Sequence, residues 1–193
     1  MRAIGVSGLP GSGKALVSDI ASENGAMIVV MGDIIREEAK KRGESTKETA
    51  DNLRKEHGQY IVAELTIEKI RKIREEGFDS LIIVDGIRSP YEVDLFKENF
   101  EDFIIVSIFA NPQIRFERIK SRKREDDTID YDVFVKRDQQ ELGWGIGDVI
   151  SLSDKIIINE SLFCHVAVFV EVVVFTAQVF PACGQCAGGG GIV

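Results

Sequence analysis

The first 160 residues contain no cysteine, and this absence limits what can stabilise them. All three cysteines of the 193-residue chain, Cys164, Cys183 and Cys186, lie beyond that point. A disulfide framework is therefore excluded for the body of the chain, and a cysteine-based zinc site is excluded with it. Stability must come from an apolar core, and 193 residues are long enough to form one main domain around such a core.

Positive charge is scarce in the whole chain and absent from its end. The 24 Lys and Arg residues face 32 Asp and Glu residues, which gives a net charge of −8. This charge argues against nucleic acid or an anionic membrane surface as a partner, so any phosphate site must be a local basic pocket. No Lys or Arg lies beyond residue 160. We therefore predict a main domain over residues 1–160 and an atypical apolar tail over residues 161–193.

The tail is apolar, yet it is poorly suited to a membrane. Residues 162–180 are just long enough to span a bilayer, but Glu171 lies near the middle, where a charge costs about 2.5–3.5 kcal/mol. Cys183 and Cys186 have CxxC spacing without the βαβ context of a redox motif or the second pair of a zinc site. We interpret the tail as a frame-shifted or otherwise foreign end. Because Met1 and Arg2 lead directly into an apolar strand pattern, without a signal peptide, we expect a cytoplasmic protein.

A glycine-rich loop near the N-terminus indicates a phosphate-binding site. The segment GLPGSGK, residues 8–14, follows the apolar run of residues 3–6 and precedes a helical pattern, which is the order of a P-loop. Glycines allow backbone N–H groups to point at phosphate oxygens, and the helix N-terminus adds positive potential. The predicted nucleotide-binding residues are Gly8, Pro10, Gly11, Ser12, Gly13, Lys14 and Ala15, with Lys14 as the charge for the β- and γ-phosphates.

The cofactors that this loop predicts are ATP and Mg²⁺, although one metal ligand of the general pattern is missing. Ala15 follows the lysine, where the pattern has a Ser or Thr hydroxyl that binds magnesium. Ser18 is about one helical turn further along, too far to take the same place. We therefore expect Asp85 to support the metal, through water. A carboxylate that caps the next turn is the alternative interpretation of Asp85.

Strand and helix patterns alternate along residues 2–158 and predict an α/β fold. Apolar runs at 2–6, 27–31, 81–84, 103–109 and 155–158 are the expected strands. The intervening segments are predicted to be helices, and capping signals lie at Ser45, Ser89-Pro90 and Asn111-Pro112. In the first of these helices, over residues 14–24, we expect Leu16, Ile20 and Ala21 to face the core. Such crossovers require a parallel sheet with ligands at its carboxyl edge, so we predict a three-layer α/β/α P-loop fold with five parallel strands.

Two further motifs resemble the nucleoside monophosphate kinases, and adenylate kinase most closely. Gly32-Asp33-Ile34-Ile35-Arg36 is similar to the glycine-aspartate-x-x-arginine element of that family, and Asp85-Gly86-Ile87-Arg88 is similar to its DG-x-P-R element. We expect Asp33 and Asp85, which follow predicted strands, to orient the acceptor or magnesium-bound water, and capping of the next turn is the alternative for each. The resemblance implies that Arg36 and Arg88 hold the acceptor phosphate, a task that suits planar guanidinium groups. It also implies a helical acceptor-binding insertion over about residues 33–76.

A basic segment resembles the lid of adenylate kinases. Six basic residues lie between Arg115 and Arg124, and Arg115, Arg118 and Arg122 share one stripe of the expected helix. The segment Arg124-Glu125-Asp126-Asp127, followed by Arg137, is similar to the lid element whose arginines close over the transferring phosphoryl group. The resemblance implies a short lid over about residues 115–140, with Arg118, Arg124 and Arg137 as catalytic residues beside Lys14 and Asp85, and Arg122 as a further candidate.

The resemblance covers residues 1–160 and is closest to the uncharacterised adenylate-kinase-related proteins of archaea. It implies an ATP-dependent kinase whose partner is a small nucleotide-like acceptor. Residues 152–159, LSDKIIIN, are also similar to the corresponding segment of dephospho-CoA kinases, and Glu92 stands where adenylate kinases have an adenine-reading glutamine. The acceptor is therefore open between the two kinase groups. Because Ala15 departs from the metal-binding pattern, a nucleotide-binding regulatory protein without turnover is a third hypothesis.

Overall fold

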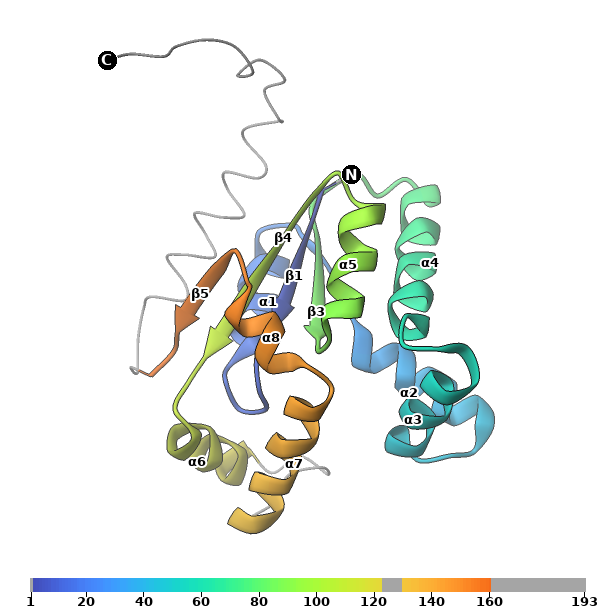
Figure 1. Ribbon diagram of the computed structural model, residues 1–193. Helices are drawn as coiled ribbons and strands as arrows, with labels where there is room; N and C mark the ends of the chain where they lie inside the picture. The colour runs from blue at the N-terminus through green and yellow to red at the C-terminus, as the bar shows by residue number, and fades with distance from the viewer. Residues whose placement is uncertain (1, 123–129, 161–193) are drawn as a thin grey trace, which may run out of the picture.

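The computed structural model describes residues 2–122 and 130–160. Its centre is a sheet of five parallel strands in the order β2-β3-β1-β4-β5. The strands are β1 (Arg2–Ser7), β2 (Met27–Val30), β3 (Ile82–Ile87), β4 (Asp102–Phe109) and β5 (Lys155–Ile158). The predicted α/β fold with a five-stranded parallel sheet is confirmed. All five carboxyl ends point to the same end of the molecule, the lower end in Figure 1.

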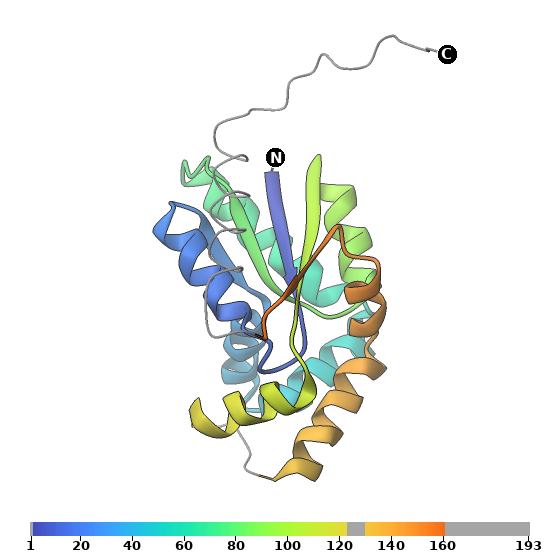
Figure 2. The ribbon, with the colours of Figure 1, turned by 90° about the vertical axis from the view of Figure 1, so that its left-hand side faces the viewer.

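Helices cover both faces of this sheet, as Figure 2 shows. They are α1 (Lys14–Glu23), α2 (Met31–Arg42), α3 (Thr46–His57), α4 (Ile61–Glu75), α5 (Pro90–Asn99), α6 (Pro112–Arg122), α7 (Tyr131–Gly143) and α8 (Ile146–Ser151). Successive strand residues point to opposite faces, so the sheet builds two apolar cores. Val6 and Ile83 pack with Ala21 of α1 on one face, whereas Ile82 and Val84 pack on the other with α4, α5 and α8.

The larger core packs α4 and α5 against the sheet. Phe96 on α5 is fully buried and stacks on Phe103 of β4, with ring centroids 5.3 Å apart. Ile70 of α4 is buried in the same core. Helices α2 and α3 then extend beyond the carboxyl edge of the sheet, at the lower right of Figure 1. Helix α7 also lies below the sheet in this view.

Three local predictions were wrong. Helix α2 begins at Met31, not at Ile34, because Asp33 fits the first turn, where the helix N-terminus favours a negative charge. Strand β3 continues to Ile87, past the predicted end at Val84, because its pairing with β1 continues beyond an irregularity at Val6 and Ser7. Leu16 is 44% exposed because Val17 and Ala21 occupy the buried positions of α1.

The capping predictions are confirmed. Ser45 and Ser89 each form a full capping box, with Glu48 and Glu92 respectively, and the side chain of Asn111 accepts a hydrogen bond from the backbone N–H of Gln113. Within residues 2–122 and 130–160, every helix is too short or too polar to cross a lipid bilayer. The predictions for the tail, residues 161–193, concern a part of the chain outside the described residues.

Candidate active site at the carboxyl edge of the sheet

The glycine-rich loop connects β1 to α1 at the carboxyl edge of the sheet. Gly13 has a φ of 102° at the N-cap of α1, a left-handed conformation that favours glycine. Gly11 has a φ of 81°, and a Cβ atom there would lie 2.6 Å from the carbonyl oxygen of Arg115. The amide of Asn159 at the end of β5 donates a hydrogen bond of 2.9 Å to the Ser12 carbonyl. The loop is therefore fixed from two sides.

Lys14 begins α1 and folds back over this loop. Its Nζ donates hydrogen bonds to the carbonyl oxygens of Gly8 and, at 3.4 Å, Leu9. Burial lowers the pKa of Lys14 from 10.5 to about 8, and the nearby carboxylate of Asp85 partly opposes this effect. A buried ammonium group of this kind lacks a full counter-charge. Phosphate oxygens in the loop would supply it.

Asp85 and Ser18 meet beside the lysine. The hydroxyl of Ser18 donates a hydrogen bond of 3.2 Å to Oδ2 of Asp85, whereas Oδ1 is buried and accepts no hydrogen bond from any residue that the structure describes. Burial also raises the pKa of Asp85, an effect that Lys14 opposes. Ser18 thus points at Asp85 one helical turn after Lys14, closer to the site than its sequence position suggested.

This pair suits a magnesium ion that is bound mainly through nucleotide phosphates. In the described part of the chain no group of three or more His, Cys, Asp or Glu side chains could hold a metal without other ligands. Mg²⁺ commonly binds through one or two carboxylates together with substrate phosphates and water. The unsatisfied Oδ1 of Asp85 and the hydroxyl of Ser18 fit that ligand set. When bound, the ion would neutralise charge on the donor phosphates.

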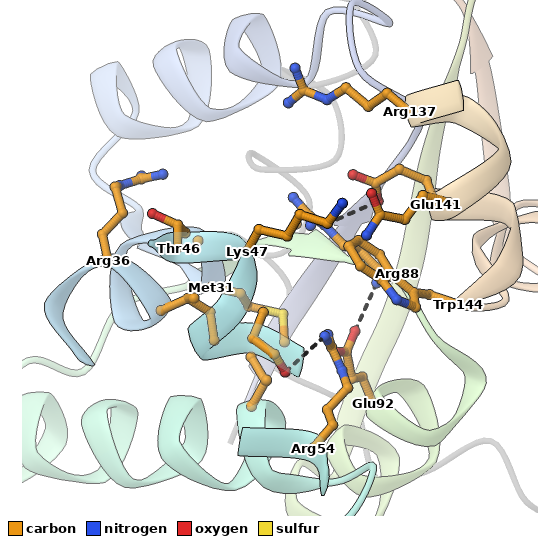
Figure 3. A pocket seen from close by; sticks show the side chains of 16 residues that line it. Met31, Arg36, Thr46, Lys47, Arg54, Arg88, Glu92, Arg137, Glu141 and Trp144 are labelled. Carbon is orange, nitrogen blue, oxygen red and sulfur yellow. Dashed lines mark hydrogen bonds and ion pairs between the residues drawn. The ribbon is translucent and has the colours of Figure 1, made fainter. Parts of the chain in front are cut away.

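Two cavities adjoin at this edge of the sheet. The first, the phosphate-loop cavity, has a volume of about 230 Å³ and is lined by the glycine-rich loop, Lys14 and Asp85. The second cavity, of about 380 Å³, lies among α2, α3, the end of β3 and α7 (Figure 3). The charged residues that line both are Arg36, Arg88, Arg137 and Glu141. A donor in the first cavity and an acceptor in the second would therefore meet among three arginines and one carboxylate.

Arg88 has ordered partners on the wall of the second cavity. Its Nε lies 3.3 Å from Oε2 of Glu141, and its guanidinium lies 5.5 Å from the ring centroid of Trp144. Arg54 from α3 contacts the same ring at 5.1 Å. Such cation–π contacts orient the guanidinium groups. Figure 3 shows Arg88 between Glu141 and Trp144.

Glu92 forms the floor of the second cavity rather than an exposed recognition group. Its side chain is 1% exposed, and Oε2 accepts hydrogen bonds from the backbone N–H groups of Arg88 at 2.8 Å and Ser89 at 3.2 Å. Oε1 lies 3.7 Å from Nη2 of Arg54. Burial raises the pKa of Glu92, and the backbone N–H of Arg88 and the charge of Arg54 oppose that rise. Glu92 thus ties the start of α5 to α3.

The remaining predicted residues lie at different distances from the two cavities. Asp33 and Arg36 form an ion pair on α2, with about half of each side chain exposed. Arg118 lies 3.4 Å from the Ser12 carbonyl and lines a third cavity, of about 650 Å³, beside Asn159. Arg122 lines the phosphate-loop cavity. Arg124 lies outside the described residues.

Arg115 differs from the other arginines of its helix because it is buried. It donates two hydrogen bonds to Asp138 of α7, at 2.9 and 2.6 Å, and one each to the carbonyls of Pro10 and Ala110, both at 3.1 Å. Its guanidinium is thereby satisfied by the protein. Arg115 connects the glycine-rich loop to α6 and α7.

Sequence reasoning missed Arg54, Glu141 and Trp144. Arg54 and Glu141 are each one of several charged residues in a polar helix, and Trp144 follows the last residue of α7. No local motif distinguishes them. Their proximity to Arg88 arises only because α3 and α7 both extend past the carboxyl edge of the sheet. The signal available in the sequence was limited to Trp144, which is the chain's only tryptophan.

Comparison with known proteins agrees with this geometry. Residues 7–132 match the family model described as an AAA domain. A UPF0200 protein of Methanothermobacter thermautotrophicus is 49% identical over 160 residues, which cover 83% of this chain and 82% of that protein. The chain belongs to the UPF0200 family. Another UPF0200 protein, from Pyrococcus furiosus, is 42% identical over 173 residues, covering 86% of this chain and 92% of its own length.

Two of the solved structures that are similar to this UPF0200 protein are kinases by name. A shikimate kinase from Bacteroides thetaiotaomicron has a TM-score of 0.55 at 15% identity, covering 92% of this chain and 99% of its own. A sugar kinase from Janibacter has a TM-score of 0.59 at 12% identity, covering 92% and 94%. At such identities the likeness establishes the fold alone, a P-loop kinase-like α/β fold.

Proposed function

We propose that the protein is an ATP-dependent phosphotransferase that transfers the γ-phosphoryl group of ATP to a small nucleotide-like acceptor. The observation that carries the proposal is the adjacency of the two cavities. One is lined by the P-loop and Lys14, the other by the helical insertion, and three arginines line both. Phosphoryl transfer depends mainly on positioning and on stabilising spread negative charge, and this arrangement suits both needs.

The proposed roles follow from placement. Lys14 and the loop amides would bind the β- and γ-phosphates, and Asp85 would support Mg²⁺, with Ser18 as its partner. Arg36 and Arg88 would hold an anionic group of the acceptor in the second cavity. Arg137, with Arg118, Arg122 and Arg124 as further candidates, would stabilise the transferring phosphoryl group.

A test of turnover uses Arg137, which lines both cavities. Contacts that strengthen only as charge develops affect kcat more than binding. We expect Arg137→Gln to lower kcat by about 1000-fold, as for other transition-state arginines, with a much smaller loss of ATP affinity. Lys136→Gln is the matched control, because it removes one charge from an exposed position on the same helix. Equal losses of affinity and rate would contradict the assignment of Arg137.

The acceptor and the alternative functions are tested in one assay. Purified protein, Mg²⁺ and γ-labelled ATP are incubated with nucleoside monophosphates and with dephospho-CoA, and binding is measured by calorimetry. Transfer to dephospho-CoA alone would favour the dephospho-CoA kinase-like hypothesis, which the segment at residues 152–159 suggests. ATP binding without transfer or hydrolysis would favour the regulatory hypothesis, which is suggested by Ala15 in place of the usual Ser or Thr.

A further inference from the structure

Glu141 occupies a distinctive position among the carboxylates near the two cavities. Asp85 lines the phosphate-loop cavity only, and Glu92 lines the second cavity only. Asp33 lines neither and is paired with Arg36 at the surface. Glu141 lines both. It is therefore the carboxylate at the junction where an acceptor atom would meet the γ-phosphate.

The negative charge of Glu141 acts on Lys14 in the phosphate-loop cavity. Its carboxylate is close enough to Lys14 to oppose the fall in the pKa of that lysine. Lys14 is the group expected to contact the β- and γ-phosphates. Glu141 thus lies within electrostatic reach of the phosphoryl group that is transferred.

One oxygen of Glu141 is buried beside Arg88 and lacks a hydrogen-bond donor. The residue is 5% exposed, and no residue in the described ranges donates a hydrogen bond to its Oε2. Arg88 Nε lies 3.3 Å from this oxygen and orients the carboxylate without satisfying it. A buried carboxylate oxygen without a donor costs free energy, which a ligand group that carries a proton would recover.

The chemistry of the acceptor oxygen decides whether a carboxylate such as that of Glu141 can assist phosphoryl transfer. The oxygen of a phosphate monoester is already ionised, so it needs no base, and a carboxylate beside it would repel it. An alcohol hydroxyl must lose its proton as it attacks phosphorus, and a carboxylate is the usual proton acceptor. The arginines around Glu141 can still hold an anionic group elsewhere on the same acceptor.

We propose that the acceptor oxygen is an alcohol hydroxyl of the nucleotide-like substrate and that Glu141 accepts its proton. This inference rests on the proposed phosphotransferase activity and specifies its substrate class. The hydroxyl oxygen forms a bond to the γ-phosphorus while the bond from that phosphorus to the β–γ bridging oxygen breaks. The electron pair of the broken bond stays on ADP, and the hydroxyl proton moves to the Glu141 carboxylate and then to solvent. The product is a phosphate monoester.

The test compares Glu141→Gln with Glu141→Asp. Glutamine has the same shape but cannot take the proton, whereas aspartate keeps a carboxylate on a shorter side chain. Phosphoryl transfer is measured to whichever acceptor of the panel is phosphorylated and also to water, which attacks through an O–H group as an alcohol does. Glu98→Gln is the matched control, because it removes the same charge from an exposed position on α5. Melting temperatures confirm that each variant is folded.

We expect Glu141→Gln to lower kcat at least about 100-fold, the usual contribution of a general base, while the ATP dissociation constant stays within about threefold of wild type. Glu141→Asp should retain more activity than Glu141→Gln, and Glu98→Gln should match wild type. The ³¹P spectrum of the product should show a monoester. A phosphoanhydride product, or full activity in Glu141→Gln, would overturn the inference while leaving the phosphotransferase standing. If wild-type protein binds ATP but transfers the γ-phosphoryl group to no acceptor of the panel and not to water, the proposed function itself fails, and the inference fails with it.

Discussion

Substituting Lys14 should stabilise the ligand-free protein while it weakens nucleotide binding. Burial lowers the pKa of Lys14 from 10.5 to about 8, which corresponds to about 3 kcal/mol of unfavourable free energy in the charged folded state. Lys14→Met removes this cost. It also removes two hydrogen bonds to loop carbonyls, and part of the lysine side chain is in contact with water. We therefore expect a net gain of about 1–2 kcal/mol at pH 7.

The direction of the pKa shift of Lys14 also predicts how the stability difference between the two proteins changes with pH. Because the folded pKa is below the unfolded pKa, the cost is complete below pH 8 and is lost between about pH 8 and 10.5. Urea unfolding of wild type and Lys14→Met at pH 7 and pH 9.5 should therefore give a large difference at pH 7 and a smaller one at pH 9.5. Lys136→Met, at an exposed position, is the control and should show no such trend. A Lys14→Met protein less stable than wild type at pH 7, or a difference independent of pH, would refute the reasoning.

Two further substitutions test the framework around the site. Arg115→Met should lower the free energy of unfolding, measured in urea, by about 3–5 kcal/mol, because it leaves the half-buried carboxylate of Asp138 without its partner. A loss below about 1 kcal/mol would show that this ion pair does not stabilise the fold. Ser18→Ala should weaken binding of ATP with Mg²⁺ but not of ATP alone, because its hydroxyl orients Asp85; equal weakening in calorimetry with and without Mg²⁺ would contradict a link to the metal.

The architecture was predictable because its signals are local and repeated. Strands that are buried on both faces read as continuous apolar runs, and capping boxes such as Ser45 with Glu48 mark helix starts within four residues of sequence. The rotation of α1 was not predictable in the same way. Its apolar residues at 16, 17, 20 and 21 allow more than one buried face, and packing against the sheet selects Val17 and Ala21.

The candidate site was predictable only where its residues form a recognisable sequence motif. The glycine-rich loop, Lys14 and the residues that follow the apolar runs of β2 and β3 were predicted as site residues because their spacing matches a phosphate site. Glu141 and Trp144 follow the segment of residues 123–129 and reach Arg88 only through the tertiary placement of α7. Arg115 was misleading for a related reason. Its spacing puts it in a basic stripe, whereas the fold buries it against Asp138.

Calorimetric titration of the folded protein with ATP and Mg²⁺ tests the central claim most directly, with wild type and Lys14→Met compared at pH 7. The account predicts saturable binding at one site in wild type and a loss of about 10- to 100-fold in affinity for the variant, since a charge-assisted hydrogen bond contributes about 1.5–3 kcal/mol. Absence of binding to folded wild-type protein, or equal affinity in the two proteins, would contradict it.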